Sequence, residues 1–456
     1  MDTTTSQINN NMGNKKAWVV SVLMGLGHMR PAYNLRDIAL DGVIIYGDRE
    51  STPPKEYKMW QRIQKAYYFL SKAREIPLIG KYIMASTLRI QKIEHYYPIK
   101  DLSQANLSVE YLDYLIARKD FCAPLIEKIK VADIPVINTF YATAIAIDKV
   151  GKNIRDNYLL ICDTDFNRVW VPKKPRQTRI KYLVPCTQSK KRLLSYGVPE
   201  KNISLTGFPL PKENIGTQKE LEILREDLFK RLLRLDPANK FFSFHQKSVF
   251  SFLGKNSIPD NREDCFTLTC AIGGSGAQVE LIEIILRSLK DKIAAGKIRV
   301  NISAGIQKPV FEQILSYINT LGLGPYRDKG VAMIYDTDVR RQLDKFNQAL
   351  RQTDVLWTKP SELSFYSALG IPILLGPSIG PHEDLNRRWL DEIHAGVEPT
   401  DSLEYIHEWL FDLRENGRLA EAAWDGFLKG RKLGTYKIEE LIRTGKFTSG
   451  QTPLEQ

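Results

Sequence analysis

The sequence is poor in cysteine and histidine. Its 456 residues include five cysteines and six histidines, and no two cysteines form a C-x-x-C pair. These numbers exclude a disulfide-rich scaffold and provide no zinc or redox motif. We therefore expect reduced thiols, as in a cytoplasmic protein, and no metal site.

Long apolar runs are also missing. Uncharged apolar stretches such as Ile134 to Ile147 are short, whereas a membrane-spanning helix needs about 20 apolar residues. Residues 1–16 are polar and lack the apolar segment of a signal peptide. We expect this N-terminus to be disordered and any membrane contact to be peripheral, on the inner face of the membrane.

Acidic residues are outnumbered by basic ones. The formal net charge is +12, which favours contact with phosphates or an anionic membrane surface. Residues 55–100 combine ten Lys or Arg with many aromatic residues, and residues 166–199 hold nine Lys or Arg and no acid. The expected membrane contacts are Lys58, Trp60, Arg62, Lys65 and Lys72. The alternative is that these aromatic residues pack in a core and the lysines face water.

Short apolar strands alternate with helical segments along most of the chain, which predicts parallel sheets covered by helices. The predicted strands are 17–24, 42–46, 135–138, 158–162, 182–185 and 203–211, then 266–272, 298–304, 331–335, 355–358 and 372–375. The pattern occurs twice, so we expect two doubly wound α/β domains at 17–211 and 263–400. Residues 212–262 are interpreted as a linker elaboration. Residues 401–456 are expected to form helices that pack back on the N-terminal domain.

Three polar segments follow strands of the second half. In CAIGGSGAQ a strand ends in a glycine turn that leads into a helix, where free amides and the helix dipole bind phosphate. Thr358 to Glu362 follows another strand, and a carboxylate there suits ribose or sugar hydroxyls. Gly376 to Asn386 is a polar loop that offers donors and acceptors. Each segment is also compatible with a plain turn or a helix cap.

Two segments of the first half carry candidate catalytic groups. His28 follows the first strand, where an imidazole can act as a general base, although a lone histidine is more often structural. Asp163 and Asp165 follow another strand and can orient a hydroxyl or cap a turn.

Taken in order, these motifs resemble the GT-B glycosyltransferases of the group that contains monogalactosyldiacylglycerol synthase and the peptidoglycan lipid-linked N-acetylglucosaminyltransferase. The matching segments are GLGHMRPA at 25–32, CDTDFNRVW at 162–170, LTGFPLP at 205–211, GGSGA at 273–277, TKPSELSFYSALGIP at 358–372 and GPHEDLNRRWL at 380–390.

The resemblance implies two Rossmann-like domains facing a cleft, with the acceptor in the N-terminal domain and a UDP-sugar in the C-terminal one. It assigns Gly25, Gly27 and His28 to the acceptor loop and places Asp163 and Asp165 at a family Thr-Asp segment. The implied donor-binding residues are Gly273, Gly274, Ser275, Gly276, Thr358, Lys359, Ser361, Glu362, His382, Glu383 and Asn386. Phe365 stands where the family often has an acid, so Glu362 is the expected substitute.

The expected function is inverting, metal-independent sugar transfer from a nucleotide sugar to a lipid or lipid-linked acceptor at the membrane surface. No cofactor and no nucleic-acid partner are expected, since the nucleotide sugar is a substrate. Two alternatives stay open: a UDP-N-acetylhexosamine 2-epimerase, which needs no acceptor, and a non-catalytic lipid- or nucleotide-binding protein.

Overall fold

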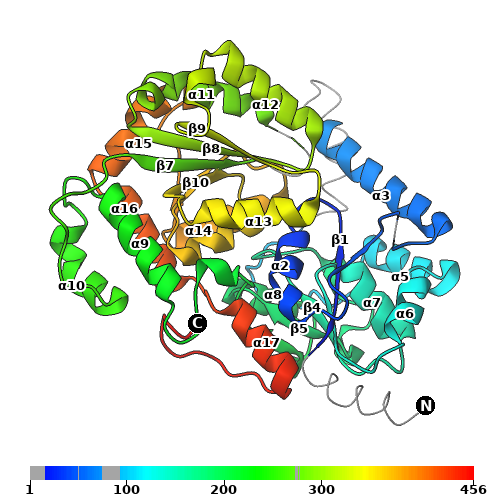
Figure 1. Cartoon of the computed structure of the whole chain (residues 1–456). Coiled ribbons are helices and arrows are strands. Elements are labelled where there is room, and N and C mark those ends of the chain that lie inside the picture. Colours follow the sequence, from blue (N-terminus) through cyan, green and yellow to red (C-terminus); the bar gives the residue numbers. More distant parts are fainter. Residues whose placement is uncertain (1–15, 50, 74–92, 273–275, 277) are drawn as a thin grey trace, which may run out of the picture. The chain divides into compact units, whose positions relative to one another are not determined.

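The structure, a computed structural model, describes residues 16–49, 51–73, 93–272, 276 and 278–456. It divides into two compact units (Figure 1). Unit 1 contains the chain up to Pro209, Ile379–Leu385 and Leu433–Gln456. Unit 2 contains Leu210–Ser378 and Asn386–Lys432.

Unit 1 is built on a six-stranded parallel sheet in the order β2-β1-β3-β4-β5-β6. Its strands are β1 Trp18–Val22, β2 Ile44–Tyr46, β3 Val136–Asn138, β4 Asn157–Leu160, β5 Lys181–Val184 and β6 Ile203–Leu205. All residues of β1, β3 and β4 are buried, as expected for central strands of a parallel sheet that is covered on both faces.

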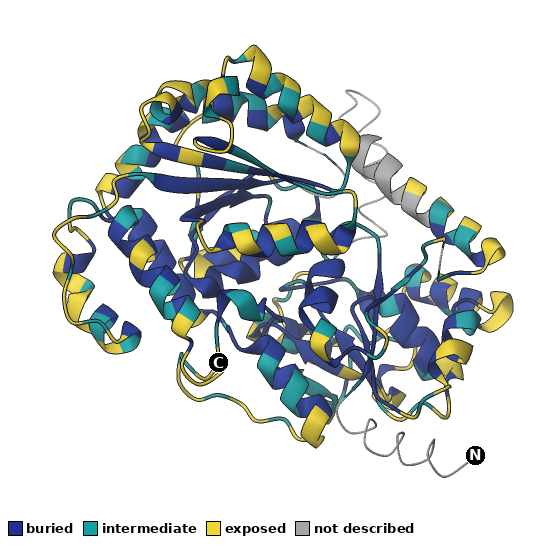
Figure 2. Ribbon diagram, in the orientation of Figure 1, coloured by how far each residue is buried: buried dark blue, intermediate teal, exposed yellow. Residues whose placement is uncertain are grey.

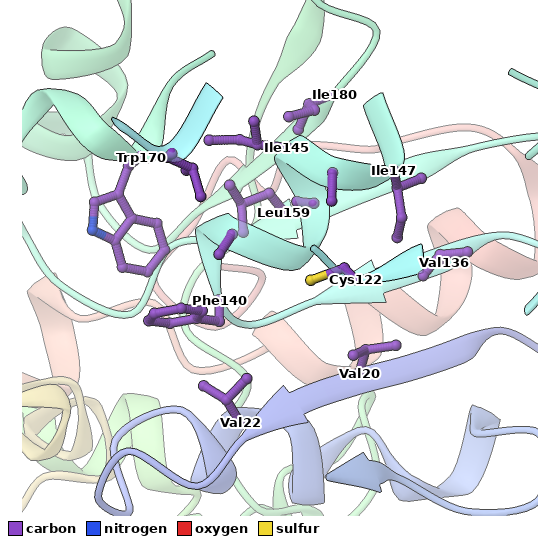
Figure 3. Close-up of a cluster of buried hydrophobic side chains, with 14 of the residues drawn as sticks. Val20, Val22, Cys122, Val136, Phe140, Ile145, Ile147, Leu159, Trp170 and Ile180 are labelled. Carbon is purple, nitrogen blue, oxygen red and sulfur yellow. The ribbon is translucent and has the colours of Figure 1, made fainter. Parts of the chain in front are cut away.

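Helices cover this sheet and complete one hydrophobic core. They are α2 Met29–Asn34, α3 Pro54–Ala73, α5 Leu107–Lys119, α6 Ala123–Ile129, α7 Tyr141–Val150, α8 Thr187–Ser195 and α17 Gly434–Thr444. Figure 3 shows Ile145 and Ile147 of α7 above Val136 and Leu159 of the sheet. Phe140 and Trp170 lie at one end of the same cluster.

Unit 2 has a second six-stranded parallel sheet in the order β12-β11-β10-β7-β8-β9. Its strands are β7 Phe266–Ala271, β8 Ile298–Gly305, β9 Val331–Tyr335, β10 Val355–Thr358, β11 Ile373–Leu375 and β12 Gly396–Val397. The strands of both sheets are mostly buried (Figure 2). The predicted fold class, two Rossmann-like doubly wound domains, is therefore confirmed at the level of each domain.

The helices of unit 2 include two that the sequence analysis placed in a linker. The full set is α9 Glu222–Leu235, α10 Phe242–Leu253, α11 Val279–Ala294, α12 Lys308–Thr320, α13 Val339–Leu350, α14 Pro381–Glu392, α15 Ile406–Glu415 and α16 Arg418–Lys429. Helix α14 is divided, because its residues up to Leu385 fall in unit 1. The other helices of this set belong wholly to unit 2.

The interpretation of residues 212–262 as a linker is wrong, because α9 is integrated in unit 2. The fully buried Arg231 donates to the carbonyl oxygens of Thr353 at 2.7 Å and Leu369 at 2.9 Å. Burial lowers the pKa of Arg231 to about 10. At Gly370, where φ is +67°, a Cβ would lie 2.5 Å from Leu228 of α9.

The C-terminal residues divide between the two units. Helices α15 and α16 belong to unit 2, and residues 433–456 with α17 belong to unit 1. Gly434 packs so closely that a Cβ would lie 2.3 Å from the carbonyl oxygen of Phe208. The glycine thus permits α17 to approach the end of the unit 1 segment that precedes Leu210.

Candidate active site

Each sheet has a point at which the strand order reverses. In unit 1 the chain continues from β1 to β2 on one side and later adds β3 on the other side of β1. In unit 2 the chain continues from β7 to β8 on one side and later adds β10 on the other side of β7. Ligands of open α/β sheets bind beyond the carboxyl ends of the strands at such points. His28 follows β1, the glycine turn follows β7 and Thr358 ends β10, so these candidates lie at the two reversal points.

A cavity of about 410 Å³ lies beyond the ends of β1, β3 and β4 in unit 1. All its lining residues belong to that unit. The polar ones are His28, Ser108, Asp163, Asn167 and His382. The aromatic ones are Trp60, Tyr111, Phe121, Phe140, Tyr141, Phe166 and Trp170. Such a mostly apolar cavity with a few convergent polar groups is the usual form of a small-molecule site.

His28 is held at the cavity by its backbone and by two aromatic rings. The buried Ser21 hydroxyl donates to the His28 carbonyl oxygen at 2.9 Å and lies 3.0 Å from the Thr139 hydroxyl, which follows β3. The imidazole meets Phe140 edge-on at 5.1 Å and lies 5.9 Å from Trp170. In the preceding turn Gly25 has φ +88°, a conformation that favours glycine. Gly27 of the same turn is half-buried.

The two predicted carboxylates have different surroundings. Asp163 is half-buried and lines the cavity. Asp165 is 1% exposed and accepts hydrogen bonds from Arg192 Nε at 2.6 Å and from the Phe166 amide at 2.8 Å. Its other oxygen accepts from Arg192 and Gln188. A catalytic role for Asp165 is thus contradicted, because its carboxylate is occupied by a buried ion pair that joins the β4 end to α8.

The aromatic residues of the cavity other than Tyr111 form a connected wall. Ring centroids are separated by 4.3 Å between Phe140 and Tyr141, by 5.2 Å between Tyr141 and Trp170, and by 5.9 Å between Trp170 and Phe166. Most of these distances fall within the range of favourable ring pairs. Burial raises the pKa of Tyr141 to about 12, so this phenol is neutral at physiological pH.

Trp60 extends the same wall, which corrects one sequence prediction. It is 4% exposed and its ring lies 5.1 Å from Phe121 and 6.0 Å from Phe140. A side chain buried in this way does not lie at the level of lipid headgroups, so the alternative of core packing applies to Trp60. Lys58, Arg62 and Lys65 of the same helix are exposed, and the side chain of Lys72 lies outside the described residues.

The basic run at 166–199 is opposed by acids from other segments of unit 1. Arg168 and Arg192 are buried. The paired surface cations are Lys173 with Glu110, Arg176 with Asp101, Arg179 with Asp148, Lys181 with Asp156 and Lys190 with Glu200. The lack of acids within the run therefore does not make it an unopposed basic surface, because acids outside the run pair with five of its cations.

In unit 2, hydrogen bonds tie the ends of three neighbouring strands together. The Thr358 hydroxyl donates to the Ala271 carbonyl oxygen at 3.3 Å, which links β10 to β7. The Gly376 amide donates to the Thr358 carbonyl oxygen at 2.9 Å, which links β11 to β10. Lys359 and Ser361 are half-buried in the loop that follows, before a 3-10 helix at Glu362–Leu369.

Glu362 and Phe365 occupy that 3-10 helix. Glu362 is 9% exposed, whereas Phe365 is buried with its ring 5.1 Å from Trp389. The position at which the family often has an acid is therefore part of the hydrophobic core in this chain. Glu362 stays the candidate for the ribose contact.

The glycine turn after β7 is described only in part. Gly273, Gly274 and Ser275 lie outside the described residues, and Gly276 has φ +70°. A Cβ on Gly276 would lie 2.6 Å from Val310 near the start of α12. The described end of the turn thus combines a glycine conformation with close packing.

The three predicted sugar contacts of the last loop divide between the units. His382 lines the unit 1 cavity. The buried Glu383 accepts hydrogen bonds from the Ile379 and Gly380 amides, the latter at 3.1 Å, and so caps the start of α14. Asn386 belongs to unit 2, is fully buried, and donates to the Pro360 carbonyl oxygen at 3.4 Å.

Within the described part of the chain, no group of three or more His, Cys, Asp or Glu residues is arranged to hold a metal ion. No helix there is both long and apolar enough to cross a bilayer.

Several cavity residues were missed by the sequence analysis. Phe140 and Tyr141 directly follow the predicted strand at 135–138, so their position at a strand end was a usable signal. Tyr111 on α5 had no comparable signal, since it reaches the cavity from a separate helical segment, whereas Trp170 ends the matching segment at 162–170.

Comparison with known proteins gives one partial family match and several similar folds. Residues 323–438 match the model of a domain of unknown function, DUF6938. No curated protein matches the sequence.

The solved structures with a similar chain course include two with UDP or UDP-GlcNAc bound. The MnaA–UDP co-structure of S. aureus shows 11% identity and a TM-score of 0.47, with coverage of 95% of this chain and 99% of that chain. Acinetobacter baumannii MurG shows 12% identity and a TM-score of 0.46, with coverage of 94% and 99%. UDP-GlcNAc 2-epimerase from Neisseria meningitidis bound to UDP-GlcNAc shows 14% identity and a TM-score of 0.43, with coverage of 93% and 98%.

Proposed function

We propose that the chain is a glycosyltransferase that moves a sugar from a nucleotide sugar, most simply UDP-linked, to a lipid or lipid-linked acceptor at an anionic membrane surface. The observation that carries the proposal is the unit 1 cavity, in which His28 and Asp163 stand against an apolar aromatic wall beyond the strand ends. This combination suits an acceptor with one reactive hydroxyl and an apolar body. The ordered motifs shared with the lipid-glycosylating group support the same reaction.

In the proposed step, the acceptor hydroxyl oxygen attacks the anomeric carbon of the donor sugar. The bond between that carbon and the diphosphate oxygen breaks, and the electron pair leaves on the nucleoside diphosphate. The hydroxyl proton passes to the imidazole of His28, which acts as general base. Asp163 orients the hydroxyl or the imidazole from the end of β4.

The leaving diphosphate requires positive charge in unit 2. The glycine turn precedes α11, and amides at a helix N-terminus stabilise developing negative charge. Lys359, in the loop after β10, adds a cation at the same edge of the sheet. These groups would stabilise the leaving charge in a metal-independent reaction, which is the kind that the resemblance implies.

Two features next to the cavity support contact with a membrane. Lys58, Arg62 and Lys65 form an exposed basic stripe on α3 at helical spacing. Leu107, Tyr111 and Tyr114 form an exposed apolar stripe on α5, and their exposed fractions are 88%, 63% and 49%. Both helices contribute to the cavity wall, through Trp60 and Tyr111 respectively.

The test is an assay of UDP release from a panel of UDP-sugars, with and without a membrane lipid extract. We expect UDP release that depends on the extract and a glycosylated lipid by mass spectrometry. Isomerisation of UDP-N-acetylhexosamine without the extract would contradict transfer and favour the epimerase. UDP binding by calorimetry without any turnover would favour the non-catalytic alternative.

A further inference from the structure

The cavity of unit 1 is lined more by flat rings than by flexible aliphatic side chains. Seven of its lining residues are aromatic, and five are Met, Ile, Leu or Val. The rings come from separate segments of the chain, including α3, α5, the start of α7 and the 3-10 helix Arg168–Trp170. We propose that the acceptor hydroxyl is carried directly on an aromatic ring, so that the substrate is a phenol. This inference rests on the proposed function and concerns the acceptor side of the same site.

The rings of the wall pack against one another. Phe140 lies 4.3 Å from Tyr141, 6.0 Å from Trp60 and 6.4 Å from Trp170. A flat ring placed against such faces gains ring-pair contacts in addition to apolar burial. A saturated chain of equal size gains only the burial. The wall therefore discriminates between the two kinds of acceptor group.

His28 belongs to this wall as well as to the polar group of the cavity. Its imidazole packs edge-on against Phe140 at 5.1 Å, so a ring bound beside Phe140 lies within reach of the imidazole. A phenolic hydroxyl, with a pKa of about 10 as in tyrosine, releases its proton to an imidazole much more readily than an aliphatic alcohol does. In the transfer step the phenolic oxygen bonds to the anomeric carbon, the diphosphate leaves with the electron pair, and His28 takes the proton.

Tyr111 shows where a longer substituent leaves the cavity. It lines the cavity, yet 63% of it is exposed. Next to it on α5, Leu107 and Tyr114 continue the apolar surface outward. A phenol with an alkyl tail thus fits both the ring-lined cavity and the lipid character of the proposed acceptor.

The experiment measures acceptor binding by calorimetry without any nucleotide sugar. Naphthol and decanol serve as probes because both carry one hydroxyl and the same number of non-hydrogen atoms. Dioctanoylglycerol represents two-chain lipids. We expect naphthol to bind on the order of tenfold more tightly than decanol, and dioctanoylglycerol not to bind in the cavity.

Two variants test whether the cavity causes the preference for naphthol over decanol. Trp170→Leu is expected to abolish this preference. Because Trp170 is buried, Tyr111→Leu provides a second variant at a largely exposed ring, where the fold does not depend on the side chain. Tyr111→Leu should reduce naphthol affinity several-fold, whereas Tyr114→Leu, one turn away and outside the cavity lining, should not.

The outcomes separate this inference from the proposed function. Equal or tighter binding of decanol or dioctanoylglycerol, or an unchanged preference in both cavity variants, would overturn the aromatic acceptor. Naphthol binding that follows the predicted pattern, without transfer from any UDP-sugar, would keep the ring site and remove the glycosyltransferase proposal.

Discussion

His28 is the residue with the most demanding role in the proposed reaction. Its backbone is tied to β1 and β3 through Ser21 and Thr139, and its ring packs on Phe140. We expect His28→Ala to reduce turnover by about a hundredfold or more, the range for loss of a general base. UDP affinity, measured by calorimetry, should barely change because the proposed diphosphate and ribose contacts belong to unit 2.

His394→Ala is the matched control, since His394 is a largely exposed histidine that is not one of the candidate site residues. Its turnover should equal that of the unchanged chain. Full turnover in His28→Ala would remove this imidazole from the mechanism.

Lys432 provides a prediction, also at the residue scale, about how the free energy of unfolding depends on pH. It is fully buried, with its ammonium 4.8 Å from the Phe427 ring and 3.1 Å from the Gly430 carbonyl oxygen. Burial lowers the pKa of Lys432 to about 7 in the folded state, whereas an unfolded lysine has a pKa of about 10.4. Between these values the unfolded chain binds more protons, so this group makes folding more favourable as pH rises.

The expected signal is a change in the stability difference between two chains. From pH 7 to pH 8, the free energy of unfolding of the unchanged chain should rise by about 1 kcal/mol relative to that of Lys432→Met. Urea unfolding at both pH values measures it. Lys429→Met, at a half-exposed lysine paired with Asp425, should show no such relative change. A difference independent of pH would show that Lys432 keeps an ordinary pKa.

At the scale of elements, the strand-turn-helix segment from β7 to α11 is the proposed diphosphate site. Gly276 has a left-handed backbone conformation, and a Cβ there would lie 2.6 Å from Val310. We expect Gly276→Ala to shift the turn and weaken UDP binding by on the order of tenfold, measured by calorimetry. The strained backbone should also lower the unfolding midpoint, so UDP affinity is compared with that of a variant that carries similar backbone strain.

Gly296→Ala controls for backbone strain in the same unit. Gly296 has nearly the same φ, +68°, but its Cβ would have no neighbour within 4 Å. This variant should bind UDP normally, because only the conformational cost is added. If both variants bind UDP with equal affinity, the glycine turn does not contribute to nucleotide binding.

Ion pairs between different helices and loops change how the charge of a segment such as 166–199 is interpreted. The run 166–199 contains no acid in sequence, yet α5 and other segments supply partners such as Glu110 for Lys173 at 2.6 Å. Exposed pairs of this kind contribute roughly 0–1 kcal/mol to stability, and they reduce the local positive charge. The exposed cations of α3 and the apolar stripe of α5 are therefore the better candidates for membrane contact.

At the scale of the whole molecule, the net charge of +12 and these two stripes predict reversible membrane binding. Liposome co-sedimentation should increase with anionic lipid and decrease with salt, because exposed charges are screened over about 10 Å at 0.1 M ionic strength. Replacing Lys58, Arg62 and Lys65 by Glu should weaken binding, since each basic residue contributes roughly 1 kcal/mol at an anionic surface.

An apolar variant separates the two contributions. Leu107→Ser with Tyr114→Ser should also reduce co-sedimentation, whereas Phe244→Ser, at an 86% exposed phenylalanine of α10, should not. Absence of binding by the unchanged chain at low salt would refute membrane contact and favour an acceptor delivered from solution.

The sequence by itself determined the two doubly wound domains and most of their strands. Runs such as Val331–Tyr335 and Val355–Thr358 were predicted with the bounds that the structure has. Strand periodicity, glycine turns and strand-end positions are local properties, which depend on neighbouring residues. For the same reason the positions of His28, Asp163 and Thr358 at strand ends follow from the order of residues along the chain.

Only the tertiary structure decided which of these residues share a site. It paired Asp165 with Arg192, 27 positions away, and buried Trp60 against Phe121 and Phe140. The aromatic wall is assembled from segments that are separated by long stretches of chain, and no local pattern records which side chains meet there. Packing between distant segments therefore set the chemistry of the cavity, although the sequence had already indicated the edge of the sheet at which it forms.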